Sequence, residues 1–447
     1  MKKSFILVLA ALLVVAFTLP ASAFENIFGG YFRTRLWTQE NMSGDENDDS
    51  LDKSLIDQRT RLYYTAKFSD NFSFVNKFEI DADWGDNTLG DLGADGISFE
   101  VKNSYVDFTL GSVRSTIGIQ GATLARGFIL GDDLSAAIIR YQPGTTQDLL
   151  VPFIWGKLSE RDTDGDTLTT LPNLSVPQIA GDSDVNLFGL YPYFPMGDFS
   201  LNPYFFYVQT DRGLYRDSDW YYLGVDADAK FGDIGLWGSL IYNGGKLART
   251  AFTGDPADRG QDNDISGYLF AIGGNFPVGP LALRSQFFWA SGQDLNDDPE
   301  TGADIDAFVT IGESGLGTSY YWSEIMGLGI FDDNASAGSP GDHITNIWAF
   351  NVGTDFNITE GSKLAVDLWY ASLVEDNLLG DSDLGFEIDV VYTVNLIENL
   401  NLELVGAYQF AGDAVTADGF NFDADPADLQ DNQDNPWILG TRLSFSF

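Results

Sequence analysis

One short stretch of the sequence concentrates cations on a single side. In DQRTRLYYTAKF (57–68), Arg59, Arg61 and Lys67 occupy odd positions. The even positions carry Leu62, Tyr64, Ala66 and Phe68. Because successive side chains of a β-strand point to opposite faces, this stretch predicts a strand with one cationic face and one apolar face. Charged side chains that line an aqueous passage bias which ions move through it.

The same alternation assigns further cations to the charged face. Arg33 and Arg35, for example, alternate with the apolar side chains Phe32 and Leu36, whereas Arg126 belongs to GATLARGFILGDD, a loop candidate able to fold inward. The predicted basic track consists of Arg33, Arg35, Arg59, Arg61, Lys67, Lys77, Lys102, Arg114, Arg126 and Arg140. The acids in this region are expected to pair with Lys77 and Lys102; they are Glu79, Asp81, Asp83 and Glu100.

Acidic residues take the corresponding positions in later segments. The predicted acidic wall consists of Asp355, Asp367, Glu387, Asp389 and Glu403. A basic arc and an acidic arc on one pore wall would create a transverse field that orients dipolar solutes. A simpler interpretation stays open, in which the arginines hydrate the interior and neutralise neighbouring carboxylates.

Segments of alternating polarity recur along the chain and must position these charges. Examples are GFEIDVVYTVN (385–395) and NLNLELVGAYQF (399–410). Each is about ten residues long, which is the length that a tilted strand needs to cross a bilayer. After the N-terminal region, no apolar run approaches the ~18 residues that indicate a membrane-spanning helix. The sequence therefore predicts an all-β fold, a transmembrane antiparallel β-barrel.

The number of segments predicts a barrel of about 18 strands. We find 13 strand candidates up to residues 280–290, and five more begin at 346. Counts of 16 or 20 stay open, the larger one if AFVTIGES and GTSYYWSEIM also span. Short turns such as FGDI (231–234) alternate with long acidic segments, as periplasmic turns and extracellular loops do in bacterial barrels.

The longest connection, residues 292–345, is a candidate constriction of the lumen. It contains Tyr320, Tyr321 and Trp322, and such aromatic side chains invite a sugar-binding interpretation. Most other aromatic residues fit an interfacial girdle at the edges of the membrane.

The N-terminal residues predict export from the cytoplasm. A positive start, an apolar run of about 15 residues and small residues before the cleavage point form the pattern of a signal peptide, 1–23, cut after Ala23. A retained membrane anchor is the alternative, but a span needs ~20 residues. Residues 24–447 then form a single barrel domain.

Catalytic and metal chemistry has little support in the sequence. The chain has no cysteine and one histidine, His343, without a nucleophile motif, so we expect no enzyme. Asp162, Asp164 and Asp166 form a weak calcium candidate, because the full loop spacing and the distal glutamate are missing. Apart from such loosely bound calcium, we expect no cofactor. A formal net charge of −42 disfavours nucleic acid as a partner.

Two features resemble Gram-negative porins. The last residues, WILGTRLSFSF, resemble the C-terminal signal read by the barrel-assembly machinery. Residues 28–44, 58–86 and 118–133 are similar to the alginate-export group of large channels, usually described as 18-stranded. This resemblance implies an outer-membrane location, contact with lipid and lipopolysaccharide, and passage of solutes. It leaves open whether the chain forms homo-oligomers.

These observations favour a porin, a water-filled channel for passive diffusion of small hydrophilic solutes. The basic track would guide anions or carboxylates through the lumen. Two alternatives stay open: a polysaccharide export channel of the alginate type, and a structural barrel that houses periplasmic partners.

Overall fold

A computed structural model describes ten stretches of the chain. They are residues 24–45, 48–86, 99–144, 149–160, 184–210, 218–250, 259–294, 304–311, 320–416 and 434–447. The predicted signal peptide and the calcium candidate at Asp162, Asp164 and Asp166 lie outside these residues. Within them, no helix is long and apolar enough to cross a membrane.

The described residues form strands and one short 3-10 helix. The strands before residue 200 are β1 (Glu25–Glu40), β2 (Lys53–Ser69), β3 (Phe72–Asp83), β4 (Glu100–Leu110), β5 (Val113–Leu124), β6 (Leu130–Tyr141), β7 (Val151–Ser159), β8 (Val185–Leu190), β9 (Phe194–Met196) and β10 (Phe199–Thr210), with η1 (Ala125–Gly127) between β5 and β6. The later strands are β11 (Ser218–Phe231), β12 (Ile234–Thr250), β13 (Arg259–Val278), β14 (Leu281–Ala290), β15 (Ile347–Thr359), β16 (Ser362–Leu373), β17 (Asp383–Ile397), β18 (Leu400–Ala411) and β19 (Trp437–Ser446).

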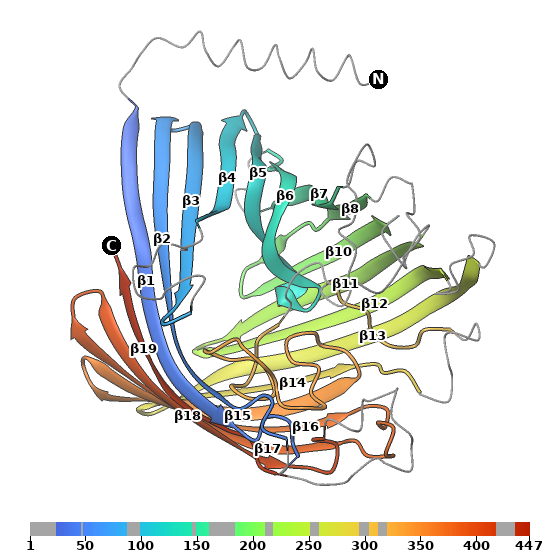
Figure 1. Cartoon of the computed structure of the whole chain (residues 1–447). Helices are drawn as coiled ribbons and strands as arrows, with labels where there is room; N and C mark the ends of the chain where they lie inside the picture. The colour runs from blue at the N-terminus through green and yellow to red at the C-terminus, as the bar shows by residue number, and fades with distance from the viewer. Residues whose placement is uncertain are drawn as a thin grey trace.

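The strands close into one antiparallel barrel (Figure 1). Strands that follow one another pair along the chain, and β1 pairs with β19 to complete the ring. Both β8 and β9 pair with β10 along the same edge, so together they occupy one strand position of the wall. We call each such strand position a stave, and this one is interrupted. The barrel thus has 18 staves in the described residues, 13 of them up to β14 and five after it, which confirms the predicted count.

A proline explains the interrupted stave. Residues 191–193 read Tyr-Pro-Tyr, and Pro192 has no N–H to donate to the ladder. Asn202 of β10 compensates, because its side-chain amide donates to the carbonyl oxygens of Tyr191 (3.0 Å) and Pro192 (2.7 Å).

Tight turns join the staves at one end of the barrel. β4 and β5, β11 and β12, and β13 and β14 are each joined by two residues. In each turn a glycine, Gly111, Gly232 or Gly279, has a φ near +60°, which glycine adopts at little cost. These positions match the short turns that the sequence predicts.

The alternation separates an outer face from an inner face. Leu36 is 50% exposed, whereas its neighbour Arg35 is 5% exposed. The same contrast holds on β15, where Phe350 is 43% exposed and Asn351 is 2% exposed. The side chains that alternate with the exposed apolar ones therefore point into the barrel, as the period-two pattern predicts.

The barrel interior also contains two segments that are not part of the wall. The first is the tip of the β5–β6 hairpin, residues 124–130, and the second is the connection that includes residues 304–311 and 320–346. They meet where the rings of Phe128 and Tyr320 stack at 4.3 Å and the Ile311 N–H donates to the Ile129 carbonyl oxygen (3.3 Å). We call them the hairpin tip and the long inward segment.

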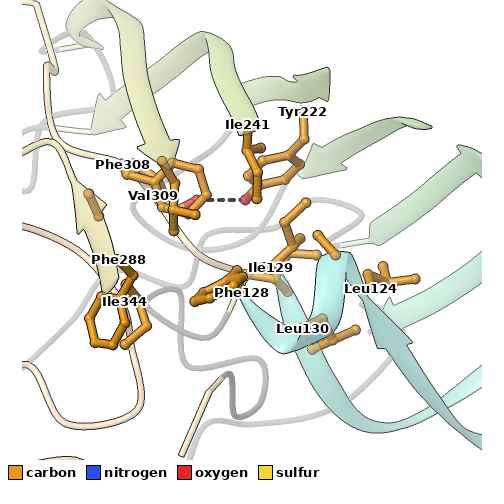
Figure 2. Packing of buried hydrophobic residues seen from close by; sticks show 14 of the residues in the cluster. Leu124, Phe128, Ile129, Leu130, Tyr222, Ile241, Phe288, Phe308, Val309 and Ile344 are labelled. Carbon is orange, nitrogen blue, oxygen red and sulfur yellow. Dashed lines mark hydrogen bonds between the residues drawn. The ribbon is translucent and has the colours of Figure 1, made fainter. Parts of the chain in front are cut away.

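Apolar side chains hold both segments against the inner wall (Figure 2). Phe128 and Ile129 of the hairpin tip are fully buried, and so is Phe308 of the long inward segment. The Tyr222 hydroxyl on β11 donates to the Val309 carbonyl oxygen (2.7 Å), the dashed contact in Figure 2. The candidate spans AFVTIGES and GTSYYWSEIM belong to this segment, and their described residues form no strand of the barrel.

The seam of the barrel is closed by Phe447. The Gly30 N–H donates to the Phe447 carbonyl oxygen (2.9 Å), and the Phe447 N–H donates back to the Gly30 carbonyl oxygen (3.2 Å). A side chain at position 30 would collide with the Phe447 ring, so this close approach requires a glycine.

Candidate functional site

Arg35 links the first strand to the long inward segment. Its Nε lies 3.0 Å from Oδ1 of Asp57 on β2, and its Nη1 donates to the carbonyl oxygens of Ile330 (2.7 Å) and Phe331 (2.9 Å). It also forms an ion pair with Asp332. The guanidinium therefore fixes the segment to the wall with several charge-assisted hydrogen bonds.

The next cations of the predicted track pair with acids on adjacent strands. Arg59 binds Asp81 in a two-pronged contact, with Nε–Oδ1 at 2.8 Å and Nη2–Oδ2 at 2.6 Å. Arg61 pairs with Glu79. The sequence-based pairing of Asp81 with a lysine is therefore wrong, because the antiparallel register places Arg59 directly opposite Asp81.

The lysines of the track have different partners. Lys102 lies 2.8 Å from Asp133 of β6 and 3.9 Å from Glu79. Lys77 lies over the Tyr63 ring, 5.3 Å from its centroid. Lys67 pairs with Asp70 at 2.9 Å in an exposed turn, where hydrogen bonding to that lysine lowers the pKa of Asp70.

Arg33, Arg114 and Arg140 differ in how well carboxylates neutralise them. Arg114 bonds Asp107, with Nη2–Oδ2 at 2.6 Å. Nη2 of Arg33 lies 3.8 Å from Asp57 and 3.8 Å from Asp332, and its Nε has no hydrogen-bond partner among the described residues. Arg140 donates to the Thr116 hydroxyl (3.1 Å) and has no carboxylate within 4 Å in the part of the chain that the structure describes.

Arg126 extends from the hairpin tip to a strand that is not its neighbour in the sheet. Its Nη2 donates to Asp228 Oδ1 (3.0 Å) and to the Ala227 carbonyl oxygen (3.2 Å), both on β11. Its guanidinium also lies over the Trp237 ring at 5.3 Å. Arg126 has a φ of +57°, which is uncommon for a residue other than glycine, and these contacts stabilise that conformation.

The predicted acidic wall contains arginines that the sequence analysis did not single out. On β14, Arg284 donates from Nη1 to Asp355 (2.5 Å) and from Nε to Asp367 (3.0 Å). On β19, Arg442 pairs with Glu403, with Nη2–Oε1 at 2.9 Å. The alternation that identified the basic track would have found both, because Arg284 alternates with Leu283 and Phe287.

Glycine at position 353 allows the Arg284–Asp367 pair to lie flat on β15. A Cβ atom at that position would overlap the Asp367 carboxylate and lie 2.9 Å from Arg284 Nε. The backbone of the wall is therefore part of the ion-pair site.

Among the residues that the structure describes, Glu387 and Asp389 of the acidic wall have no arginine partner. The Glu387 carboxylate accepts hydrogen bonds from the backbone N–H groups of Ile325 (2.7 Å) and Met326 (2.9 Å), so it fixes the long inward segment to β17. Asp389 Oδ1 has no hydrogen-bond partner among the described residues. The acidic wall is therefore partly neutralised and partly committed to holding the segment.

The long inward segment contributes its own titratable groups. Burial raises the pKa of Glu324 to about 7, and the nearby Glu387 carboxylate adds to that shift. The carboxylate of Glu324 also accepts from the Ile330 N–H (2.7 Å). Burial raises the pKa of Tyr320 to about 12, and its hydroxyl donates to Gln286 Oε1 (2.9 Å).

A cavity of about 230 Å³ lies between the long inward segment and the inner wall of β12–β17. Its lining includes aromatic rings, acids, amides and one cation. The residues are Trp237, Gly274, Asn275, Arg284, Ser285, Gln286, Trp322, Glu324, Asn351, Asp367, Trp369, Asp389 and Val391.

Comparisons with solved structures find outer-membrane proteins. OccK9 (OpdG) of Pseudomonas aeruginosa has a TM-score of 0.58 at 10% identity, with 95% of this chain and 98% of that chain covered. OpdK of the same organism has a TM-score of 0.57 at 12% identity, with 95% of this chain and 98% of that chain covered. A BenF-like porin from Pseudomonas fluorescens Pf-5 has a TM-score of 0.54 at 13% identity, with 95% of this chain and 99% of that chain covered.

No protein-family model matches the chain, and no curated protein matches its sequence. The narrower likeness to alginate-export channels stays a prediction. Because nearly the whole chain superposes on nearly the whole of each of these structures, the chain has the closed-barrel fold of Gram-negative outer-membrane porins.

Proposed function

We propose that the protein is an outer-membrane porin, a water-filled channel for passive diffusion of small hydrophilic solutes. The observation that carries this proposal is the closed ring of 18 staves with an apolar outer face and ion pairs on its inner face. A barrel of this size is too wide for wall side chains to fill, and an apolar exterior is stable only in lipid.

The two inward segments act as the constriction of this channel. They meet inside the barrel at Phe128 and Tyr320, and they are fixed to opposite parts of the wall by Arg35, Glu387 and Arg126. Because they fill part of the lumen, we favour passage of small solutes over export of a polysaccharide.

Carboxylates are the solute class that the basic track would guide. Arg33 and Arg140, the two arginines of the predicted track that described carboxylates neutralise least, would provide the sites of contact. OpdK, which shares the fold, has been crystallised with vanillate, which is a carboxylate. The lining roles of the remaining track and wall residues stay part of this proposal, and we expect no catalytic activity.

Planar lipid bilayers test the channel directly. Purified protein should insert in discrete conductance steps, and a salt gradient should give a reversal potential that reports ion preference. Heat-denatured protein serves as the control. A native, detergent-stable protein that inserts without conductance steps would refute the porin proposal.

Assembly partners are a further part of the proposal. We infer that the last strand, β19, is read by the barrel-assembly machinery and that the acidic loops lie near lipopolysaccharide, bridged by divalent cations. Export by a signal peptide would deliver the chain to both. Crosslinking from β19 during assembly, and cleavage after Ala23, would be the direct measurements.

A further inference from the structure

The cavity against β12–β17 has features that simple diffusion does not require. We propose that it is a binding subsite for an uncharged polyhydroxy solute of the size of a monosaccharide. This inference rests on the proposed channel function, because the solute would reach the cavity through the lumen. We call the cavity the tryptophan cavity, after Trp237, Trp322 and Trp369 in its lining.

Two of the tryptophan rings form a corner. The centroids of Trp322 and Trp369 lie 5.0 Å apart, with their planes at 70°. Trp322 is fixed in place because its Nε1 donates to the Gly341 carbonyl oxygen (2.9 Å) and its ring meets Phe288 edge to face. Rigid aromatic faces of this kind provide the apolar contact surface of small-molecule sites. They suit the C–H faces of a sugar ring.

The polar lining combines donors with acceptors. Arg284, Asn351 and Gln286 carry N–H groups, and Asp367, Asp389 and Glu324 carry carboxyl groups. The Asn351 amide already donates to Asp367 Oδ1 (3.0 Å) and to the Leu368 carbonyl oxygen (3.4 Å), so the groups open to a ligand include the Gln286 amide nitrogen and Asp389 Oδ1. A hydroxyl both donates and accepts, so a polyol can use both sets. An ammonium group only donates and a carboxylate only accepts, so each would leave half of this lining unused.

Asp389 supplies the strongest local evidence for a missing partner. It is 5% exposed, its carboxyl group interacts with that of Glu387, and its Oδ1 makes no hydrogen bond to a described residue. Buried polar atoms without a partner are uncommon and costly. The amide nitrogen of Gln286 is also available, because Tyr320 uses only the oxygen of that side chain.

The charge balance of the cavity disfavours anions. Arg284 is already neutralised by Asp355 and Asp367, and it is the one cation among the described lining residues. The volume of about 230 Å³ corresponds to roughly eight water molecules at ~30 Å³ each. This is room for one sugar ring and not for a chain of them.

The experiment measures block of single-channel current by D-glucose in planar bilayers. Glucose should reduce the ion current in a saturable manner. Asp389→Asn and Trp322→Ala should each raise the half-blocking glucose concentration about tenfold. Trp322→Phe, which keeps an aromatic ring, should raise the half-blocking concentration by a smaller factor. Trp348→Phe is the matched control, because Trp348 packs against Phe287 and Tyr370 on the outer face. Far-UV circular dichroism verifies that each variant folds.

The outcomes separate this inference from the porin proposal. Normal conductance with no glucose block, or with equal block in Asp389→Asn and the parent, overturns the subsite and leaves the porin intact. Block by ethanolamine or benzoate in place of glucose also overturns it, since either result assigns the cavity to a charged solute. If no conductance is seen, the porin proposal fails, and quenching of tryptophan fluorescence by glucose in detergent still decides whether the cavity binds.

Discussion

Two parts of the inner wall differ in the side chains that they direct into the barrel. On β1–β3 the inward side chains are charged and pair across strands, as Arg59 does with Asp81. On β10–β12 many of them are apolar and buried, as Phe206 and Ile241 are, although Asp226 and Asp228 of β11 also point inward. Both parts have the same apolar outer face. The difference follows from what covers each part, because the inward segments pack on β10–β12, whereas the charges of β1–β3 face polar groups of the lumen and of the segment.

This comparison separates two roles of the interior. The apolar part is a core in the ordinary sense, with close-packed side chains that anchor the constriction. The charged part is a lining, in which cations such as Arg59 and Arg61 are held close to acids on the next strand. The predictions below perturb one part at a time.

The largest effect is expected from Arg35→Ala. The change would leave Asp57 and Asp332 without their main partner and release two backbone carbonyl groups of the long inward segment. Breaking a buried pair in this way costs about 3–5 kcal/mol in the free energy of unfolding. Denaturant unfolding in detergent measures it. Arg114→Ala, whose side chain is 59% exposed, is the control and should cost below about 1 kcal/mol. Equal losses for the two variants would contradict the role of Arg35.

Phe128→Ala tests the apolar part. Phe128 is fully buried between Tyr320 and Phe288, so truncation should leave a cavity and cost on the order of 3 kcal/mol. Because the hairpin tip would no longer be anchored to the long inward segment, single-channel conductance should rise. Ile119→Ala, on the exposed outer face, serves as the control. A drop in stability without a change in conductance would mean that the packing of Phe128 stabilises the fold but does not narrow the channel.

Glu324 should make the constriction sensitive to pH. Its pKa is raised to about 7 by burial, so the protonated form fits the folded site better than the ionised form. The stabilisation that Glu324 gives the folded state is therefore fully present below its ordinary pKa near 4.5. It is lost as the pH rises through about 7. Glu387, Asp389, Arg442 and Glu403 are among the titratable and charged groups around it.

We expect open-channel noise to increase between pH 5 and pH 8, and thermal stability in detergent to fall. Glu324→Gln, which imitates the protonated form, should flatten both profiles. An unchanged profile in that variant would assign the pH dependence to another group.

The smallest effect is expected from replacing Arg59 and Arg61 by Ala. Removal of these cations leaves Asp81 and Glu79 without their partners on β2, so the reversal potential in a salt gradient should shift toward cation preference. Lysine at both positions should retain the parental value. If the alanine variant matches the parent, the charges of β2 do not determine selectivity.

Much of the wall could be predicted from sequence, because its signals are local. The alternation around Arg59 identifies the two faces, and glycines such as Gly232 mark the turns. The interruption at Pro192 was missed, although proline is a direct signal for it. The pairing of Asp81 with Arg59 depends on register, which the alternation alone does not determine.

The interior could not be predicted in the same way. Inward residues such as Phe206 and Ile241 are apolar because a distant part of the chain covers them, and that contact has no local signature. The same applies to Glu387, whose partners are backbone N–H groups about sixty residues earlier in the sequence. The tryptophan cavity combines residues of six strands and one connection, so its composition is a property of the tertiary fold.

The seam between Gly30 and Phe447 has a consequence for how the barrel is made. The two strands that meet there are the first and the last in the sheet, so no intermediate can close the ring early. Until then β1 and the growing edge each present unpaired backbone groups, which are prone to association with other chains. Contacts of such long sequence separation form slowly. The maturing chain therefore needs protection of its two open edges until the final strand arrives.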